Sequence, residues 1–377
     1  ERLGASLSAS SSDDFTIVAA STLALYSSEI LQLVAEIVFK PTFPENELDL
    51  YRRNTVEHLK FQRSQANFLA GEQTARILYG QHPYSRVSPT ADDVEKITSE
   101  DLAELHRKRF VANNAVLIVI GDVEYDALMK EVHEHFGEWR QGQAEERQFA
   151  GLQPLEARKL TIVDRPGSAQ SNIVLANLAI RRSDPDYFPV LVMNQVLGAG
   201  ASSRVFMNLR EEKGYTYGAY TRIDARKEAG DLEATAEVRT AVTGDSLREF
   251  FYELGRIRED EVSPEELADA KNFLTGVFPI RAETQEGLTG LIVSQELNQL
   301  PEDYLNTYRD HVDAVTAADV ARAAMKYISP DQMSMVIVGD AGEILTQARD
   351  YASDIELFDT EGHAKDIKEF EAGSAGE

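Results

Sequence analysis

ITSEDLAELHRKRFVANNAVLIVIGDV, residues Ile97–Val123, and VTAADVARAAMKYISPDQMSMVIVGDA, residues Val315–Ala341, follow one pattern without a gap. Each segment has a Thr three residues before an Asp, which is typical of a helix start. Each then continues through a helical stretch and a polar break to an apolar run that ends in Gly-Asp. The interval between the copies is constant, so Thr98 corresponds to Thr316. This interval is too long for a solenoid repeat, and it predicts two copies of one whole domain.

The elements around these segments indicate the fold class. Ala115–Ile120 is a continuous apolar run and predicts a buried strand. Two helices are expected to begin at prolines followed by acidic residues, over Pro44–Gln65 and Pro264–Val277. Strands and helices do not alternate strictly, so we predict an α+β fold. Its expected architecture is two tandem homologous α/β sandwich-like repeats with helices packed on a mixed sheet.

The duplication also predicts the domain boundaries. The first repeat is expected over residues 1–140 and begins late relative to the second, so we expect it to be N-terminally incomplete. A polar, Gly- and Gln-rich linker is expected over 141–159. The second repeat is expected over 160–353, and residues 354–377 are expected to form a loosely held acidic tail.

Composition excludes several classes of function. The chain has 377 residues, no cysteine and a formal net charge of −26. Thiolate metal sites and disulfides are therefore impossible. A charge of this sign disfavours nucleic acid and anionic lipid, because both bind through Lys and Arg. No apolar run is long enough to span a membrane. A chain without thiols suits either the cytoplasm or the periplasm, so the compartment stays open.

One stretch suggests a binding site. Within LGAGASSRVFMNLREEKGYTYGAY (Leu197–Tyr220), a helix carrying Arg210 is followed after Gly214 by a strand carrying Tyr217. A guanidinium and a phenol that meet in space could both donate hydrogen bonds to a peptide carbonyl or carboxylate. A packed tyrosine and an arginine that merely ends its helix would leave the same pattern.

No residues predict a metal site. The seven histidines include neither H-x-x-E-H nor H-E-x-x-H. Glu57 and His58 are adjacent in a predicted helix, and neighbouring helical residues do not point at one metal ion.

The order of the motifs resembles the insulinase/pitrilysin family of peptidases, the inverted zincins. SSRVFMNLREEKGYTYGAY (Ser202–Tyr220) resembles the signature of that family's second half. The HPYS loop at His82–Ser85, RPGSAQSNIVL at Arg165–Leu175 and the paired Gly-Asp segments are similar to that family too. The resemblance covers nearly the whole chain and includes the duplication.

This resemblance implies a clam-like chamber whose halves each hold two repeats, and a zinc site held by H-x-x-E-H and a later glutamate. Arg210 and Tyr217 match the spacing of an arginine and a tyrosine that bind peptide substrate near that zinc. The H-x-x-E-H segment is absent here, and the position of the later glutamate falls at His58, beside Glu57. These two residues are at most remnants of a metal site, so we expect no catalytic residue and no cofactor in this chain.

The resemblance therefore implies a non-catalytic, substrate-enclosing half of a zinc metallopeptidase assembly. The expected partners are a peptide substrate and a catalytic zinc peptidase subunit, which supplies the zinc, or a second copy of this chain. Two alternatives stay open. The chain could be a truncated active zinc metallopeptidase whose H-x-x-E-H segment precedes residue 1, or a structural scaffold like the core proteins of respiratory complexes.

Overall fold

The computed structural model describes residues 3–143, 149 and 151–371, which form two compact units. Neither unit is continuous in sequence. The first contains residues 1–59, 89–149 and 282–297, and the second contains 60–88, 150–281 and 298–377. One segment from each half of the chain therefore belongs to the unit built mostly by the other half.

The second unit contains a six-stranded mixed sheet in the order β5-β6-β4-β7-β3-β8. The parallel strands β7 and β8 flank β3, whereas β4, β6 and β5 continue the sheet in antiparallel pairs. The strands are β3 (Lys159–Asp164), β4 (Gln170–Leu178), β5 (Thr216–Ala225), β6 (Gly230–Arg239), β7 (Ser334–Gly339) and β8 (Asp354–Phe358). An α+β fold with helices on a mixed sheet is thus confirmed for this unit.

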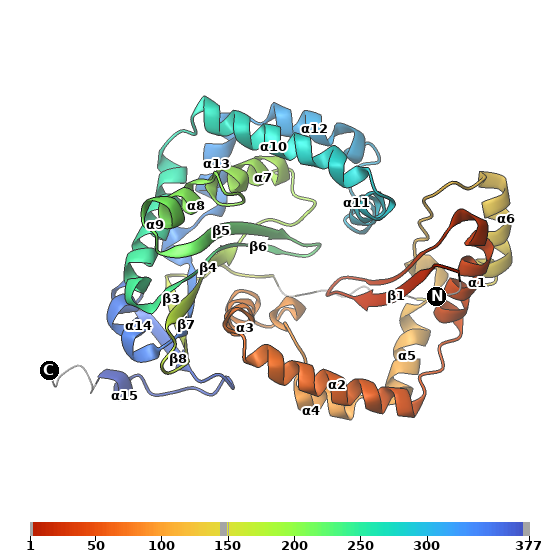
Figure 1. The fold of residues 1–377 in the computed structure, drawn as a ribbon, viewed down its shortest axis with the longest axis horizontal. Coiled ribbons are helices and arrows are strands. Elements are labelled where there is room, and N and C mark those ends of the chain that lie inside the picture. Colours follow the sequence, from red (N-terminus) through yellow and green to blue (C-terminus); the bar gives the residue numbers. More distant parts are fainter. Residues whose placement is uncertain (1–2, 144–148, 150, 372–377) are drawn as a thin grey trace. The chain divides into compact units, whose positions relative to one another are not determined.

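Helices cover both faces of this sheet (Figure 1). Alternate residues of β7 show the two layers, because Ile337 faces the larger core and Val336 and Val338 face the smaller one. The larger core includes helices α7 (Tyr187–Leu197), α9 (Thr243–Glu259), α13 (Ala317–Tyr327) and α14 (Ala341–Ala348). This unit also contains α8 (Arg204–Phe206), α10 (Pro264–Ala282, ending at the unit boundary), α12 (Tyr304–Ala314) and α15 (Lys368–Glu371).

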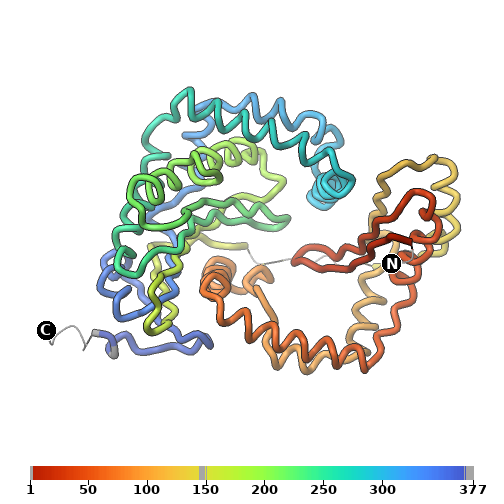
Figure 2. The backbone as a smooth tube through the Cα atoms, viewed as in Figure 1, coloured from red at the N-terminus to blue at the C-terminus, as the bar shows by residue number. Residues whose placement is uncertain are grey.

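The smaller core lies under α3 (Ala66–Tyr79), a helix from the first half of the chain. In Figure 2 its orange trace lies beside the yellow, green and blue strands, far from it in sequence. Leu69, Ala70 and Leu78 pack there on the apolar side chains of β4 and β7. Because both faces of β7 are covered, all six of its residues are buried, which explains its unbroken apolar sequence.

A buried polar contact ties α3 to the sheet. The Tyr79 hydroxyl donates to Asp231 Oδ2 on β6 at 2.5 Å, and Arg226 Nη2 lies 3.3 Å from the same oxygen. The Arg226 guanidinium also sits over the rings of Tyr79 and Tyr84. The second carboxylate oxygen of Asp231 is buried without a hydrogen-bond partner. Burial, reinforced by repulsion from nearby Glu233, raises the pKa of Asp231 to about 6 despite the Tyr79 hydroxyl and Arg226, which lower it.

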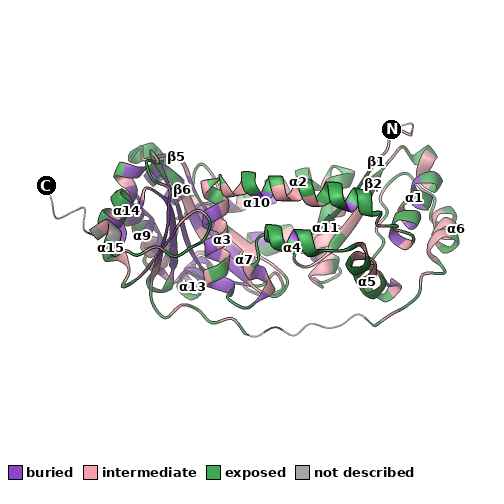
Figure 3. Ribbon diagram, turned by 90° about the horizontal axis from the view of Figure 1, so that it is seen from below, coloured by how far each residue is buried: buried purple, intermediate pink, exposed green. Residues whose placement is uncertain are grey.

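The first unit is less densely packed, and Figure 3 shows most buried residues around the sheet of the second unit. Strands β1 (Ser6–Ser11) and β2 (Thr16–Ser21) form an antiparallel pair. Helices α1 and α6 pack together, with the centres of the Phe39 and Phe136 rings 5.5 Å apart. The helices are α1 (Ser27–Phe39), α2 (Glu45–Arg63, ending in the second unit), α4 (Ala91–Lys96), α5 (Ser99–Arg109), α6 (Tyr125–Phe136) and α11 (Gln285–Leu297).

Two expectations were wrong. Ala115–Ile120 is not a strand, and Val116 is 63% exposed, because no described strand pairs with this segment. The tail is not loose at its start, because β8 joins the sheet beside β3 and Lys365 donates to buried Asp164 at 2.6 Å. None of the described helices is both long enough and apolar enough to cross a membrane.

Matched substitutions in the two apolar runs should lower the free energy of unfolding by different amounts. Met335 in β7 is fully buried, whereas Leu117, its counterpart in the first copy of the pattern, is 44% exposed. We expect Met335→Ala to lower the free energy of unfolding by about 2–5 kcal/mol and Leu117→Ala by less than about 1 kcal/mol. Urea denaturation measures both losses. Equal losses would contradict the exposed conformation of residues 115–120.

The Asp231 contact predicts a pH dependence of stability. Between pH 3.8 and about 6 the folded state keeps a proton on Asp231 that the unfolded state releases, so the contribution of Asp231 falls as pH rises. Asp231→Asn cannot ionise. Relative to wild type it should therefore gain about 1–3 kcal/mol of stability across this window, measured by urea denaturation at several pH values. Exposed Asp269→Asn is the control, and parallel curves for wild type and Asp231→Asn would contradict the raised pKa.

Candidate functional site

The helix that carries Arg210 changes its pitch before it ends. Helix α8 runs directly into a π-helix over Met207–Glu212, where the Lys213 amide donates to the Asn208 carbonyl at 3.0 Å. Turns widened in this way are rare in proteins overall, and those that do occur frequently lie at functional sites. Gly214 then ends the helix with a φ of +65°, a conformation that glycine adopts at little cost.

Arg210 is half-exposed and only weakly engaged. Its side chain is 44% exposed and lies 3.2 Å from Glu211 in an ion pair. Its guanidinium also lies 4.9 Å from the centre of the Phe206 ring. A surface ion pair contributes little stability, so a carbonyl or carboxylate of a ligand could replace Glu211 at small cost.

Strand β5 presents two tyrosines beside this helix. Tyr217 is 92% exposed and Tyr220 is 45% exposed. The Tyr220 ring lies over Gly218, where a Cβ atom would come within 2.7 Å of the ring. The pairing of β5 with β6 shifts register between Thr216 and Ala219, which re-aims the side chains at the start of the strand. A residue larger than glycine at 218 would displace the Tyr220 ring.

The Phe206 side chain contacts both Arg210 on the helix and Tyr220 on the strand. Phe206 was not predicted from the sequence. Its ring lies 5.5 Å from that of Tyr220 and under the guanidinium of Arg210. Arg210 and Tyr220 therefore share one aromatic support, and Tyr217 stands three residues earlier on the same strand. An aromatic residue four positions before the arginine was the available signal, since such pairs meet on a helix.

The start of the helix is fixed by a buried ion pair. The Arg204 side chain is 5% exposed and donates from Nε and Nη2 to the two oxygens of Glu266 at 2.7 and 3.0 Å. These hydrogen bonds lower the pKa of Glu266 to about 2. Glu266 also accepts from the Ser263 amide at the start of α10. The segment that leads to Arg210 is thereby held against α10.

The remnant metal candidates lie elsewhere. Glu57 and His58 are exposed neighbours on α2, and consecutive helical residues diverge by about 100°. The described ranges contain no group of three or more His, Cys, Asp or Glu that could hold a metal ion. Catalytic zinc needs three protein ligands, so the donor set described does not fit it.

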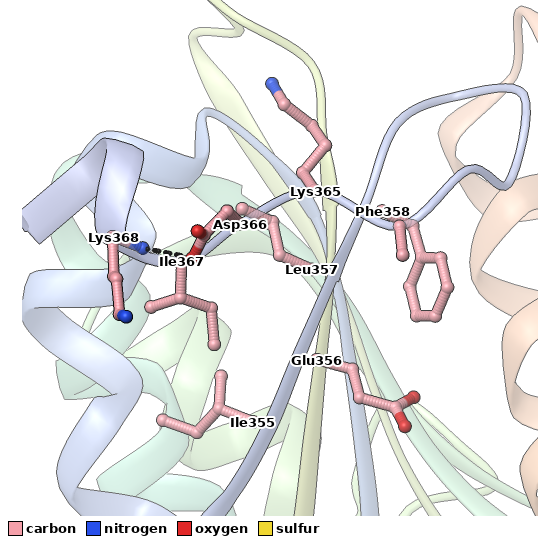
Figure 4. A pocket seen from close by; sticks show the side chains of 9 residues that line it. Ile355, Glu356, Leu357, Phe358, Lys365, Asp366, Ile367 and Lys368 are labelled. Atoms are coloured by element: carbon pink, nitrogen blue, oxygen red, sulfur yellow. Dashed lines mark hydrogen bonds between the residues drawn. The ribbon is translucent and has the colours of Figure 1, made fainter.

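A hollow of about 500 Å³ lies between β8 and the segment that follows it. In Figure 4, Ile355 and Ile367 point toward one another there, while Glu356 and Phe358 point to the other side of the strand. This hollow is lined by β8 and residues 364–368, none of which belongs to the candidate site around Arg210.

The comparisons with known proteins agree with the motifs. Residues 96–274 match the family model described as the peptidase M16 inactive domain. The solved peptidase M16 inactive domain from Pseudomonas fluorescens is similar with a TM-score of 0.84 and 26% identity, over 90% of this chain and 82% of that one. Residues 96–274 therefore belong to the M16 peptidase family, in its inactive-domain type.

Two curated relatives are similar over most of their length. An uncharacterized zinc protease of Mycobacterium leprae, ML0855, is 24% identical over 339 residues, which span 87% of this chain and 74% of the relative. A probable inactive metalloprotease of Bacillus subtilis, YmfF, is 24% identical over 310 residues, spanning 78% and 70%.

The donor chemistry predicts the metal content of the purified chain. Because Glu57 and His58 cannot supply three converging ligands, we expect less than about 0.1 zinc per chain after dialysis, and the same value for His58→Ala. Elemental analysis by plasma mass spectrometry measures this. One zinc per chain that is lost in His58→Ala would refute the assignment of these residues as remnants.

Proposed function

We propose that this chain is the non-catalytic, substrate-enclosing half of a zinc metallopeptidase assembly, and that Arg210 and Tyr217 bind the peptide. The observation that carries the proposal is the exposed guanidinium of Arg210, which lies over Phe206. Tyr220 on β5 contacts the same ring, and exposed Tyr217 lies three residues earlier on that strand. The match of residues 96–274 to the inactive-domain type supports it, as does the donor set of the described residues, which does not fit zinc. Any hydrolysis would then occur at the zinc of a catalytic M16 subunit.

The chemistry of the surface indicates the kind of ligand. A guanidinium donates several hydrogen bonds in a fixed plane, which suits peptide carbonyls and carboxylates. Exposed Tyr217 and Tyr220 offer ring faces and hydroxyls to side chains of varied sequence. The net charge of −26 would attract cationic peptides over longer range.

We further propose that the chain contains two homologous repeats, over 1–140 and 160–353, joined by 141–159. Matching elements support this. Helices α5 and α13 begin at equivalent positions of the two copies, each with a capping box made by Thr98 and Asp101 or by Thr316 and Asp319. Short 3-10 turns follow at the same interval, at Ala112–Asn114 and Pro330–Gln332. Helices α2 and α10 begin at nearly the same interval, as do α3 and α11.

The exposed apolar run of the first repeat differs from its counterpart in its neighbours. In the second unit β7 is flanked by β3 and β4. No described strand of the first unit pairs with Ala115–Ile120, so this run lacks the neighbours that bury its counterpart.

The test is reconstitution with a catalytic zinc peptidase of the same family. We expect zinc-dependent peptide cleavage that neither chain gives alone. Arg210→Ala should lower kcat/KM of the complex, because it removes a charged hydrogen bond that stabilises the transition state by about 1.5–3 kcal/mol. Tyr217→Phe should cost less, about 0.5–1.5 kcal/mol. The matched control is Arg222→Ala, because Arg222 is also exposed on β5 but is paired with Glu233 at 3.0 Å.

Each outcome distinguishes the proposed function from one of its alternatives. Unchanged kcat/KM in Arg210→Ala would refute the binding role. Cleavage by this chain alone would favour an active peptidase. A stable complex whose activity does not depend on this chain would favour a structural scaffold.

A further inference from the structure

A buried polar cluster lies behind Arg210, on the side of the helix that faces α9. Asn208, Glu249 and Glu253 are 5%, 8% and 2% exposed. The Asn208 amide donates to Glu253 Oε1 at 2.8 Å and to Glu249 Oε2 at 3.2 Å. Two carboxylates four residues apart on one helix repel one another, and burial of charge is costly unless it is paired and hydrogen-bonded. The two glutamates therefore depend on the Asn208 amide and on nearby cations.

Cations at the rim balance the two carboxylates. Lys213 Nζ lies 3.5 Å from Glu249 Oε1, and Arg248 Nε lies 3.6 Å from the same oxygen. Arg256 Nη1 lies 3.4 Å from Glu253 Oε2. Each carboxylate therefore meets a cation on its outer side and shares the single neutral amide of Asn208 on its inner side.

The same two residues, Asn208 and Lys213, also define the widened turn. The Lys213 amide donates to the Asn208 carbonyl, five residues back, while the side chains of both residues reach Glu249. Arg210 lies between them. In an α-helix the Asn208 carbonyl would instead accept from residue 212, and the residues after the turn would rotate by about 100° relative to those before it.

We infer that Asn208 is a positioning residue, whose side chain, held by Glu249 and Glu253, keeps the turn widened so that Arg210 stays over Phe206 and faces solvent. Arg204 and Glu266 fix the start of the segment, and Asn208 fixes its end. The inference rests on the proposed function for its consequence in peptide binding. The geometry of the turn, however, can be tested without any ligand.

The first experiment is amide hydrogen exchange on the intact chain, read at Lys213, Gly214 and Tyr215. These amides donate to the carbonyls of Asn208, Arg210 and Leu209 at the end of the helix. Asn208→Ala should speed their exchange about tenfold or more, equivalent to about 1.4 kcal/mol, and leave β4 and β7 unchanged. Glu253→Gln should keep their protection, because the glutamine oxygen still accepts from Asn208.

Controls separate positioning from general stability. Asn272→Ala removes an exposed asparagine from α10 and should change nothing. If Asn208→Ala does not fold, Glu253→Ala removes the nearer acceptor and gives the same readout. Unchanged exchange at the three amides, or an equal rise throughout the second unit, would overturn the inference.

The second experiment is a double-mutant cycle on the binding of a rhodamine-labelled, unstructured lysine-containing peptide, followed by fluorescence anisotropy. Asn208→Ala should weaken binding about tenfold in the wild-type background and less than about twofold in Arg210→Ala, because it acts through Arg210. Equal losses in both backgrounds would overturn the positioning role. If Arg210→Ala itself leaves binding unchanged, the proposed function fails, and the exchange experiment alone decides whether Asn208 holds the turn.

Discussion

Coverage of β7 on both faces is the constraint on which the second unit depends. All six residues of this strand are buried, so each face of the sheet needs an apolar layer. Helices α7, α9 and α13 supply one layer, but the second half of the chain leaves the other face to α3, a helix from the first half. The Tyr79–Asp231 contact ties that helix to β6. A helix from the first half of the chain is therefore part of the unit that the second half mainly builds.

The sequence predicted much of the architecture because its signals are local. The boxes at Thr98 and Thr316 begin helices α5 and α13 as expected, and the helices predicted from Pro44 and Pro264 are present as α2 and α10. Ala115–Ile120 shows the limit of such signals. Its apolar pattern matches β7, but a strand also needs neighbours, and no local pattern reports whether they are present. For the same reason β8 was missed, because β3 stabilises an acidic segment that looks like a tail.

The candidate site likewise contains residues that the sequence predicted and residues that it did not. Arg210 and Tyr217 were found because a basic residue at a helix end and a tyrosine in the next strand are visible in sequence. Phe206, Asn208 and the widened turn were not found. Their roles arise from contacts with Tyr220 and with carboxylates on α9, a helix well separated from them along the chain. The predicted role of Arg210 and Tyr217 in peptide binding stays a proposal.

The exchange of segments between the two units has a consequence for dissection of the molecule. A protease that cuts the polar stretch before β3 would give two polypeptides, yet α3 of the N-terminal one would remain packed on one face of the other's sheet. Such a nicked protein should migrate as one species under native conditions and as two in detergent. Conversely, a fragment that starts at β3 would expose Val174, Val336 and Val338 to water, and it should self-associate through that bare surface.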